Sequence, residues 1–480
     1  MSTLCKPGKW LPIITSLLLI SIVLCACGGS DESSKSSDPP PNSSQTERWD
    51  RFDIIDFEGG GPESQNVKAI ADGQGLVHIF YYKRGDAYEG NQVRYQIHHL
   101  VWDSQSSELI GEEEMLEVRP PFPEDDDSGL SNSLVLDAAL TSDDMPLVAY
   151  QGGLIPTPPN SSVPPCNPTF QGDLMVNHFT GAGWDEGLGI SGDASGKNPL
   201  FTDAYVGIFG SVAIDRQNTI HMASQCYYEM CDLHSSENPD LVYVRQTLTQ
   251  LGQLSDTWNL EELVDDYNEY GSGGAGSVSQ MGYGCKLVLD AQDNPCILYV
   301  GTPDQDGQGE DRTSVRMARR EGGDWQVEII DILEDWTVES LSAAVAPNGT
   351  IGVAYFMEEI VETTYPDHLR YAFRQPNGGW VIDIVDISSH CGDYPSLAFD
   401  IDSRPIIAYY DIHANSGPHR TRKDLKFARF ENDRWVKETV ATAGDIGRYN
   451  TAWVDAGNTA YICTYEYNNQ QIVLFRERPE

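Results

Sequence analysis

Two short segments near the end of the sequence combine carboxylate, imidazole, guanidinium and phenol side chains. Residues 390–394 read His-Cys-Gly-Asp-Tyr, and residues 445–449 read Asp-Ile-Gly-Arg-Tyr. Such groups transfer protons and bind the hydroxyls or carboxylates of sugars and peptides. The alternative is a polar rim around a water-filled channel, so no catalytic residue is assigned. The candidate ligand-binding residues are His390, Asp393, Tyr394, Asp411, His413, Arg448, Tyr449 and Tyr283.

An acidic segment at residues 301–311, GTPDQDGQGED, has oxygen ligands at alternate positions and glycines that allow tight turns. This pattern suits Ca²⁺, although the spacing is not that of an EF-hand. A solvated acidic loop is the alternative, and we expect no required cofactor, with Ca²⁺ as the one candidate. The candidate metal ligands are Asp304, Asp306, Glu310 and Asp311.

The cysteines show no zinc-motif spacing, and the sequence contains no phosphate loop, nucleophile elbow or dinucleotide fingerprint. Cys226 and Cys231 lie close enough in the sequence to form a disulfide in an oxidising compartment. We treat them as a candidate pair.

The N-terminus predicts export. Two lysines precede an apolar stretch at residues 11–24, which is short for a spanning helix and suits a signal peptide. It ends in Leu-Cys-Ala-Cys at residues 24–27, which resembles the lipobox of bacterial lipoproteins. The resemblance implies cleavage after a signal peptide of residues 1–26 and lipidation of Cys27. A glycine follows this cysteine, which favours the outer membrane, and the Ser- and Pro-rich residues 27–47 predict a flexible tether. An ordinary secretory leader or a single membrane anchor is the alternative.

The formal net charge is −42 at pH 7. Such a charge repels phosphate backbones, so we expect no nucleic-acid partner and membrane contact only through the lipid anchor. Solubility in an extracellular setting explains the charge equally well.

From residue 48 onward a unit of four short alternating strands recurs, and its clearest copy spans residues 394–440. An aromatic residue recurs in the second strand, where we expect it to pack between repeats. Aspartate ends most first strands, where we expect it to cap a tight turn. In successive repeats the first strand ends at Asp72, Asp137, Asp215, Asp290, Ala346, Asp400 and Asp455.

Seven copies of this unit predict an all-β fold, a seven-bladed β-propeller with four-stranded blades over residues 48–480. The last copy stops after its third strand. The segment Arg-Trp followed by FDIID, which begins at Arg48, matches the fourth strand of a repeat. We therefore expect the N-terminal strand to complete the last blade and close the ring.

The unit SLAFD-x4-PIIAYYD…DLKFARF…W resembles the repeats of bacterial propellers with sialidase-like and BNR-repeat folds, over about residues 48–480. The Asp-box of sialidases, Ser-x-Asp-x-Gly-x-x-Trp, does not occur at the turns. The resemblance therefore implies architecture and not activity.

Together these features favour a non-catalytic binding or scaffold propeller on the outer membrane, with a protein or a glycan as partner. The alternative is a glycan hydrolase or lyase with its site on the channel face, where the connections from fourth to first strands gather. Whether the chain is an enzyme stays open at this stage.

Overall fold

The computed structural model describes residues 48–56, 66–88, 92–118, 136–152, 173–181, 183–184, 188–189, 205–227, 240–248, 260–265, 281–301, 313–333, 336–359, 368–388, 391–412, 423–442 and 444–479. The chain divides into two compact units, residues 1–42 and 43–480, and all described residues belong to the second. They form β-strands without any helix. Across the described ranges, therefore, no helix is long and apolar enough to span a membrane.

The strands form seven antiparallel four-stranded sheets, which we number as blades in chain order. Blades 1 to 3 contain β2 (Val67–Ala71), β3 (Leu76–Tyr88), β4 (Gln92–Asp103) and β5 (Glu108–Val118); β6 (Leu136–Leu140), β7 (Pro146–Gly152), β8 (Asp173–His178) and β9 (Leu188–Gly189); and β10 (Tyr205–Ile214), β11 (Thr219–Tyr227), β12 (Asp240–Thr247) and β13 (Leu260–Asp265). Blades 4 and 5 contain β14 (Met281–Leu289), β15 (Pro295–Gly301), β16 (Thr313–Glu321) and β17 (Asp324–Leu333); and β18 (Trp336–Val345), β19 (Ile351–Glu359), β20 (His368–Arg374) and β21 (Trp380–Asp386). Blades 6 and 7 contain β22 (Cys391–Phe399), β23 (Pro405–Asp411), β24 (Asp424–Glu431) and β25 (Arg434–Ala441); and β26 (Ile446–Val454), β27 (Ala460–Glu466), β28 (Gln471–Glu477) and β1 (Trp49–Asp56).

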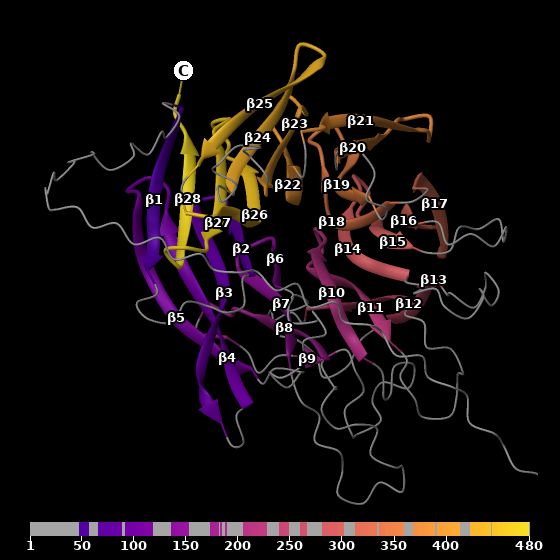
Figure 1. Ribbon diagram of the computed structural model, residues 1–480. Helices are drawn as coiled ribbons and strands as arrows, with labels where there is room; N and C mark the ends of the chain where they lie inside the picture. The colour runs from indigo at the N-terminus through magenta and orange to yellow at the C-terminus, as the bar shows by residue number, and fades with distance from the viewer. Residues whose placement is uncertain are drawn as a thin grey trace, which may run out of the picture. The chain divides into compact units, whose positions relative to one another are not determined.

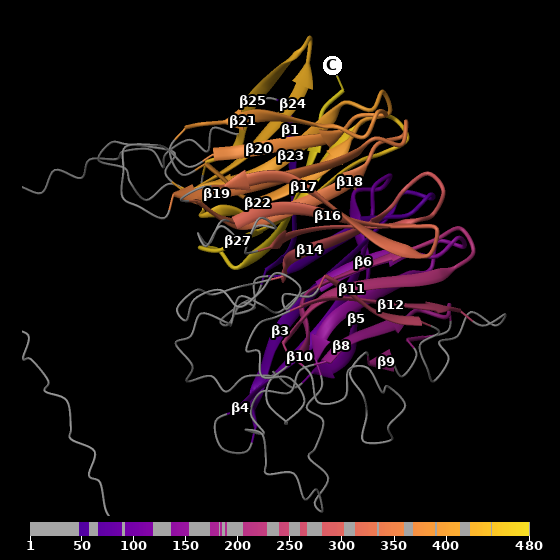
Figure 2. The same cartoon turned by 90° about the vertical axis from the view of Figure 1, so that its right-hand side faces the viewer.

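The first strands of the blades form a closed ring. Each contacts the first strands of the preceding and the following blade, and β26 of blade 7 contacts β2 of blade 1. In Figures 1 and 2 the blades follow one another in colour order, and the yellow strands of blade 7 return to the indigo β1. The prediction of a seven-bladed propeller is confirmed.

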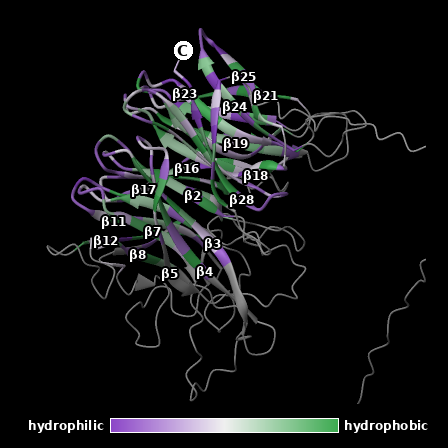
Figure 3. Ribbon diagram, turned by 90° about the vertical axis from the view of Figure 1, so that its left-hand side faces the viewer, coloured by the Kyte–Doolittle hydropathy of each residue, from purple (hydrophilic) through white to green (hydrophobic). Residues whose placement is uncertain are grey.

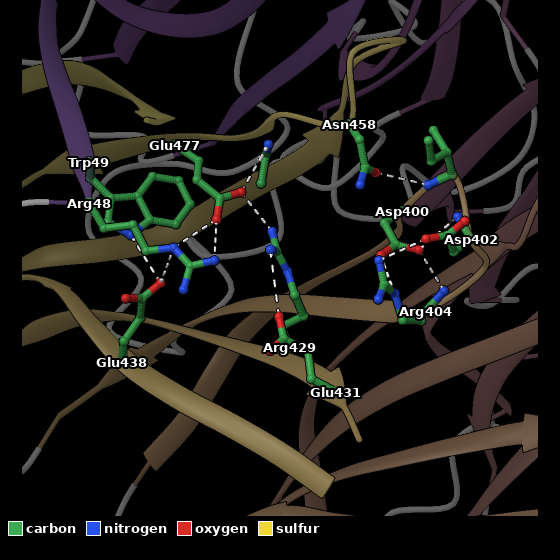
Figure 4. A network of polar contacts seen from close by, with 12 residues as sticks. Arg48, Trp49, Asp400, Asp402, Arg404, Arg429, Glu431, Glu438, Asn458 and Glu477 are labelled. Atoms are coloured by element: carbon green, nitrogen blue, oxygen red, sulfur yellow. Dashed lines mark hydrogen bonds and ion pairs between the residues drawn. The ribbon is translucent and has the colours of Figure 1, made fainter. Parts of the chain in front are cut away.

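The N-terminal strand closes the ring. β1 pairs antiparallel with β28, from Trp49 opposite Glu477 to Asp56 opposite Gln471. The Trp49 indole N–H also donates to Oε1 of Glu438 in blade 6, at 3.2 Å (Figure 4). The last blade is therefore joined both to its own N-terminal strand and to its neighbour, as predicted.

Aspartate caps the turn between first and second strands. Oδ1 of Asp400 accepts the backbone N–H groups of Asp402 (3.0 Å) and Arg404 (2.8 Å), and the turn is drawn in Figure 4. The same pair of bonds recurs at Asp72, Asp215, Asp290 and Asp455.

The prediction for Asp137 as such a turn residue was wrong. Asp137 lies inside β6, and the turn begins four residues later at Thr141, whose Oγ1 accepts the N–H of Met145 at 3.0 Å. A threonine hydroxyl replaces the carboxylate at this turn, so the predicted end of the first strand was four residues too early.

The second strands are the most buried, and their side chains fill the space between blades. Every residue of β15, β23 and β27 is buried. Figure 3 shows hydrophobic residues along the strands and hydrophilic residues mostly in the connections. The tyrosine row packs between blades as expected, and three of its hydroxyls donate to an aspartate of the preceding blade's fourth strand. The pairs are Tyr299 with Asp265, Tyr355 with Asp331 and Tyr409 with Asp386.

Candidate functional site on the first strands of blades 6 and 7

The first strands of blades 3, 4, 6 and 7 are irregular at their N-terminal ends. In β10, β14, β22 and β26 the register with the second strand shifts twice within six residues. In blades 4, 6 and 7 a glycine lies at the first shift, where the backbone approaches the preceding blade. A Cβ at Gly392 would lie 2.6 Å from Cβ of Leu369, and one at Gly447 would lie 3.1 Å from Cα of Leu425. Such bulges redirect the side chains that follow them.

In blades 4, 6 and 7 the residue two positions after this glycine has a left-handed backbone. In blade 4 this residue is Gly284, with φ of 62°. In blades 6 and 7 it is a tyrosine, with φ of 48° at Tyr394 and 52° at Tyr449. Bulky residues rarely adopt this conformation, which costs about 1–3 kcal/mol for each residue. Blades 6 and 7 therefore hold two phenol side chains in strained positions.

Asp393 and the two tyrosines form one cluster. Oδ1 of Asp393 accepts the Ser340 hydroxyl of blade 5 at 2.9 Å and the N–H of Tyr394 at 2.7 Å. The ring centroids of Tyr394 and Tyr449 lie 4.5 Å apart at 50°, and the two side chains share a hydrogen bond. The Asn450 amide donates to the Tyr394 carbonyl at 3.1 Å, which fixes the strained backbone.

Arg448 lies beside these tyrosines, between two further aromatic rings. Its Cζ is 5.3 Å from the ring centroid of Tyr410 and 5.2 Å from that of Tyr467. Its Nε donates to the Tyr410 hydroxyl at 3.3 Å, and Nη2 lies 3.4 Å from Oδ2 of Asp445. Lys423 Nζ lies 3.0 Å from the same Oδ2. These contacts orient the guanidinium. The Arg448 side chain is 19% exposed, so a ligand can still reach it.

The environment favours the protonated forms of the acidic groups. Burial raises the pKa of Asp393, the charge of Glu358 adds to this, and its hydrogen bonds and the charge of Arg448 oppose it. Burial likewise raises the pKa values of Tyr394 and Tyr449, so both phenols stay protonated at neutral pH. The cluster therefore combines a carboxyl group with a raised pKa, two phenol donors and a fixed cation. Such a set can donate a proton to a leaving oxygen and bind an anionic or hydroxyl-rich ligand.

The structure places two other predicted site residues outside this cluster. Asp411 is 2% exposed, and its Oδ2 lies 2.6 Å from Nζ of Lys426, so it serves an ion pair inside blade 6. Tyr283 occupies the matching bulge of β14 and packs against the hydrophobic residues between blades 4 and 5. Of the eight predicted ligand-binding residues, the structure brings together Asp393, Tyr394, Arg448 and Tyr449.

Several predictions fall outside the described residues. These are His390, His413, Asp304, Asp306, Glu310, Asp311, Cys27 and Cys231. The backbone of Cys226 lies in β11. Within the described ranges no three metal-ligating side chains gather in one place. The buried cysteines Cys296, Cys391 and Cys463 are free thiols.

Sequence reasoning missed three contributors, Ser340, Tyr410 and Tyr467. Tyr410 follows the buried tyrosine of the repeat and points to the opposite side of its strand, where its hydroxyl donates to Oδ1 of Asp445 at 2.5 Å. The double tyrosine of AYYD was the only signal for it.

Comparisons with known proteins identify the fold. No protein-family model matches the sequence, and no curated protein matches it. A PL25 ulvan lyase solved with bound -[GlcA(1-4)Rha3S]- is 11% identical, with a TM-score of 0.53, and the match covers 88% of this chain and 95% of that one. A protein of unknown function from Dyadobacter fermentans is 12% identical, with a TM-score of 0.45, over 72% and 93% of the two chains. The NanB sialidase from Streptococcus pneumoniae is 11% identical, with a TM-score of 0.42, over 89% and 70%. The chain is a seven-bladed β-propeller whose structural neighbours include glycan-active enzymes.

Proposed function

We propose that the chain is a glycan-active enzyme, a hydrolase or a lyase, whose site is the cluster around Asp393 and Arg448. The observation that carries this proposal is the pair of strained tyrosines. Tyr394 and Tyr449 adopt the left-handed conformation beside a carboxyl group with a raised pKa, where blade 4 has Gly284. Backbone strain of this kind concentrates at functional sites.

This proposal departs from the non-catalytic binding module that the sequence favoured. A passive rim needs neither a carboxyl group with a raised pKa nor strained aromatic residues. The ulvan lyase with the same fold, solved with a glucuronate-containing saccharide, adds support for the enzymatic alternative. The link is one of fold, and the argument depends on the cluster itself.

In a hydrolase, Asp393 protonates the glycosidic oxygen while the bond to the anomeric carbon breaks and water supplies the new hydroxyl. Glu358, an exposed carboxylate that interacts electrostatically with Asp393, is the candidate second carboxylate. In a lyase, the Asp393 carboxylate removes the proton on the carbon beside the sugar carboxylate, which Arg448 neutralises. The Tyr394 hydroxyl then protonates the leaving oxygen, and a C=C bond forms.

The test is a turnover assay with neutral and uronate-containing polysaccharides, which reads new reducing ends and the ultraviolet absorbance of unsaturated products. Reducing ends without absorbance indicate a hydrolase, and both signals indicate a lyase. We expect Asp393→Asn to reduce kcat at least 100-fold, because general acid–base groups contribute about 10²–10⁴-fold. Tyr283→Phe, in the matching bulge of blade 4, is the control and should retain activity. If no polysaccharide of the panel is turned over but one binds saturably, the result would contradict the enzymatic proposal and favour a non-catalytic binding module.

We also propose that the enzyme acts at the outer membrane, tethered through a lipidated Cys27. The lipobox-like segment supports this, and globomycin-sensitive processing with a Cys27→Ser control tests it. A Ca²⁺ ion held by the segment from Asp304 to Asp311 is the proposed optional cofactor. Chelation that leaves both activity and melting temperature unchanged would exclude it.

A further inference from the structure

One polar residue lies three positions before the end of the first strand in each blade, and we refer to the set as the axial ring. Its members occupy equivalent positions, and four of them interact across blades 1 to 4. The axial ring consists of Lys68, Asp137, Ser211, Lys286, Ser342, Ser396 and Thr451.

Five members of the axial ring follow one rule. Each side-chain oxygen accepts a backbone N–H from the first strand of the next blade, at 2.8 to 3.3 Å. The pairs are Asp137 with Val212, Ser211 with Leu287, Ser342 with Leu397, Ser396 with Ala452 and Thr451 with Ala69. A lysine cannot accept a hydrogen bond, so blades 1 and 4 break the rule.

The only carboxylate of the axial ring has no acceptor capacity left. Oδ1 of Asp137 accepts Nζ of Lys68 at 2.7 Å and the N–H of Ala138 at 3.0 Å. Oδ2 accepts the hydroxyl of Ser211 at 2.7 Å and the N–H of Val212 at 3.0 Å. These four donors use the roughly four lone-pair sites of a carboxylate.

Lys286 is therefore left without a partner of its own. Among the described residues it has electrostatic interactions with Asp137, Lys68 and Cys285 but no hydrogen bond or ion pair. Burial lowers the pKa of Lys286, Asp137 opposes this, and the charge of Lys68 adds to it. Two ammonium groups thus face one carboxylate, and half-buried charge without a partner is unfavourable.

We propose that the axial ring binds one small inorganic anion, held by Lys286 with the hydroxyl of Ser342. The Ser342 oxygen accepts the N–H of Leu397, which leaves its proton to donate to the anion. The overall charge of −42 does not prevent this binding, because exposed charges farther than about 8–10 Å are screened at physiological salt. The site needs no catalytic turnover, so it stands independently of the enzymatic proposal.

The test is thermal unfolding of the full chain in chloride and in gluconate at constant ionic strength. An anion that binds only the folded state raises Tm with its concentration until the site saturates. We expect chloride to raise Tm of the wild type by a few degrees and Lys286→Met to abolish this rise. Lys83→Met, which removes a lysine of β3 outside the axial ring, should retain it. In gluconate, Lys286→Met should be at least as stable as the wild type, because an unpaired cation is removed.

Equal melting curves in chloride and gluconate would overturn the proposal, as would a chloride effect that survives Lys286→Met. If that variant does not fold, bromide soaked into crystals of the wild type decides the question by anomalous scattering. A bromide peak within hydrogen-bond distance of Lys286 Nζ supports the site, and an axial ring without a peak excludes it.

Discussion

Three equivalent residues show how the chain uses a strained backbone position. Gly284 meets the conformational demand without strain, whereas Tyr394 and Tyr449 meet it against their intrinsic preference. Their rings contact each other, and Tyr394 also lies 6.2 Å from the ring of Tyr410. The strain at both tyrosines is consistent with the role proposed for their side chains.

This predicts that one substitution changes activity much more than stability. Tyr394→Gly relieves the left-handed strain but deletes a packed ring, so we expect the free energy of unfolding to change by less than about 2 kcal/mol. Activity should fall at least tenfold. Tyr394→Phe should keep the packing and lose the activity that depends on the hydroxyl. Denaturant unfolding and kcat measured on both variants provide the check, and full activity in Tyr394→Gly would contradict a role for the ring.

At the residue scale, the sequence predicts local features well and distant contacts poorly. The Asp400 turn was predictable because its hydrogen bonds span four residues. The Thr141 turn was not, because threonine is a weaker turn signal than aspartate. Asp393 and Arg448 were identified from residue type, but their contacts with Ser340 and Tyr410 depend on how neighbouring blades pack.

Among the elements, the fourth strands carry a repeated contact between blades. A glutamate on one blade accepts the indole N–H of a tryptophan on the next, and each of these glutamates also forms an ion pair with its own arginine. The pairs are Glu262 with Trp325, Glu328 with Trp380 and Glu438 with Trp49. Blade 5 has Asp383 at this position, and the indole N–H of Trp435 on blade 6 is buried without a hydrogen-bond partner among the described residues. A shorter side chain has left one donor of the series unsatisfied.

Asp383→Glu should therefore stabilise the propeller. The longer carboxylate can reach the Trp435 indole, and a new hydrogen bond to a charged group contributes about 1–2 kcal/mol. The matched control is Glu328→Asp, which shortens the same position where Trp380 is bonded and should destabilise by a similar amount. Urea unfolding of both variants measures the effect. A free energy of unfolding that is lower for Asp383→Glu than for the wild type would contradict the prediction that this hydrogen bond to Trp435 stabilises the propeller.

The tryptophan row was predictable as packing because it recurs at the start of the fourth strands. Its glutamate partners were not, because each lies on the preceding blade, more than fifty residues away in the sequence. Within one blade, the alternation of side chains along each strand determines which residues lie on the same face of the sheet. Between blades, only the closed ring determines which residues meet.

On the scale of the whole molecule, the contact between β1 and β28 decides whether the ring is closed. Besides the strand pairing, Arg51 Nη2 donates to Oε2 of Glu466 at 2.6 Å, and Arg48 pairs with Glu477. A chain that begins at residue 57 would expose the outer edge of β28, and a free strand edge promotes aggregation. We expect this chain to unfold at lower temperature and to associate, whereas a chain of residues 48–480 stays monomeric. Light scattering and calorimetry on the two chains test this, and equal behaviour would argue against closure by β1.

The closing contact also has a consequence in time. β1 is synthesised long before its partner β28, because Arg48 and Glu477 are 429 positions apart in the sequence. Contacts of such long range form late, since the chain entropy of closing the loop must be overcome first. Until then β1 is an unpaired strand that can join the β28 of another molecule, which makes domain-swapped dimers the natural by-product of crowded refolding. Slow, dilute refolding should favour the closed monomer.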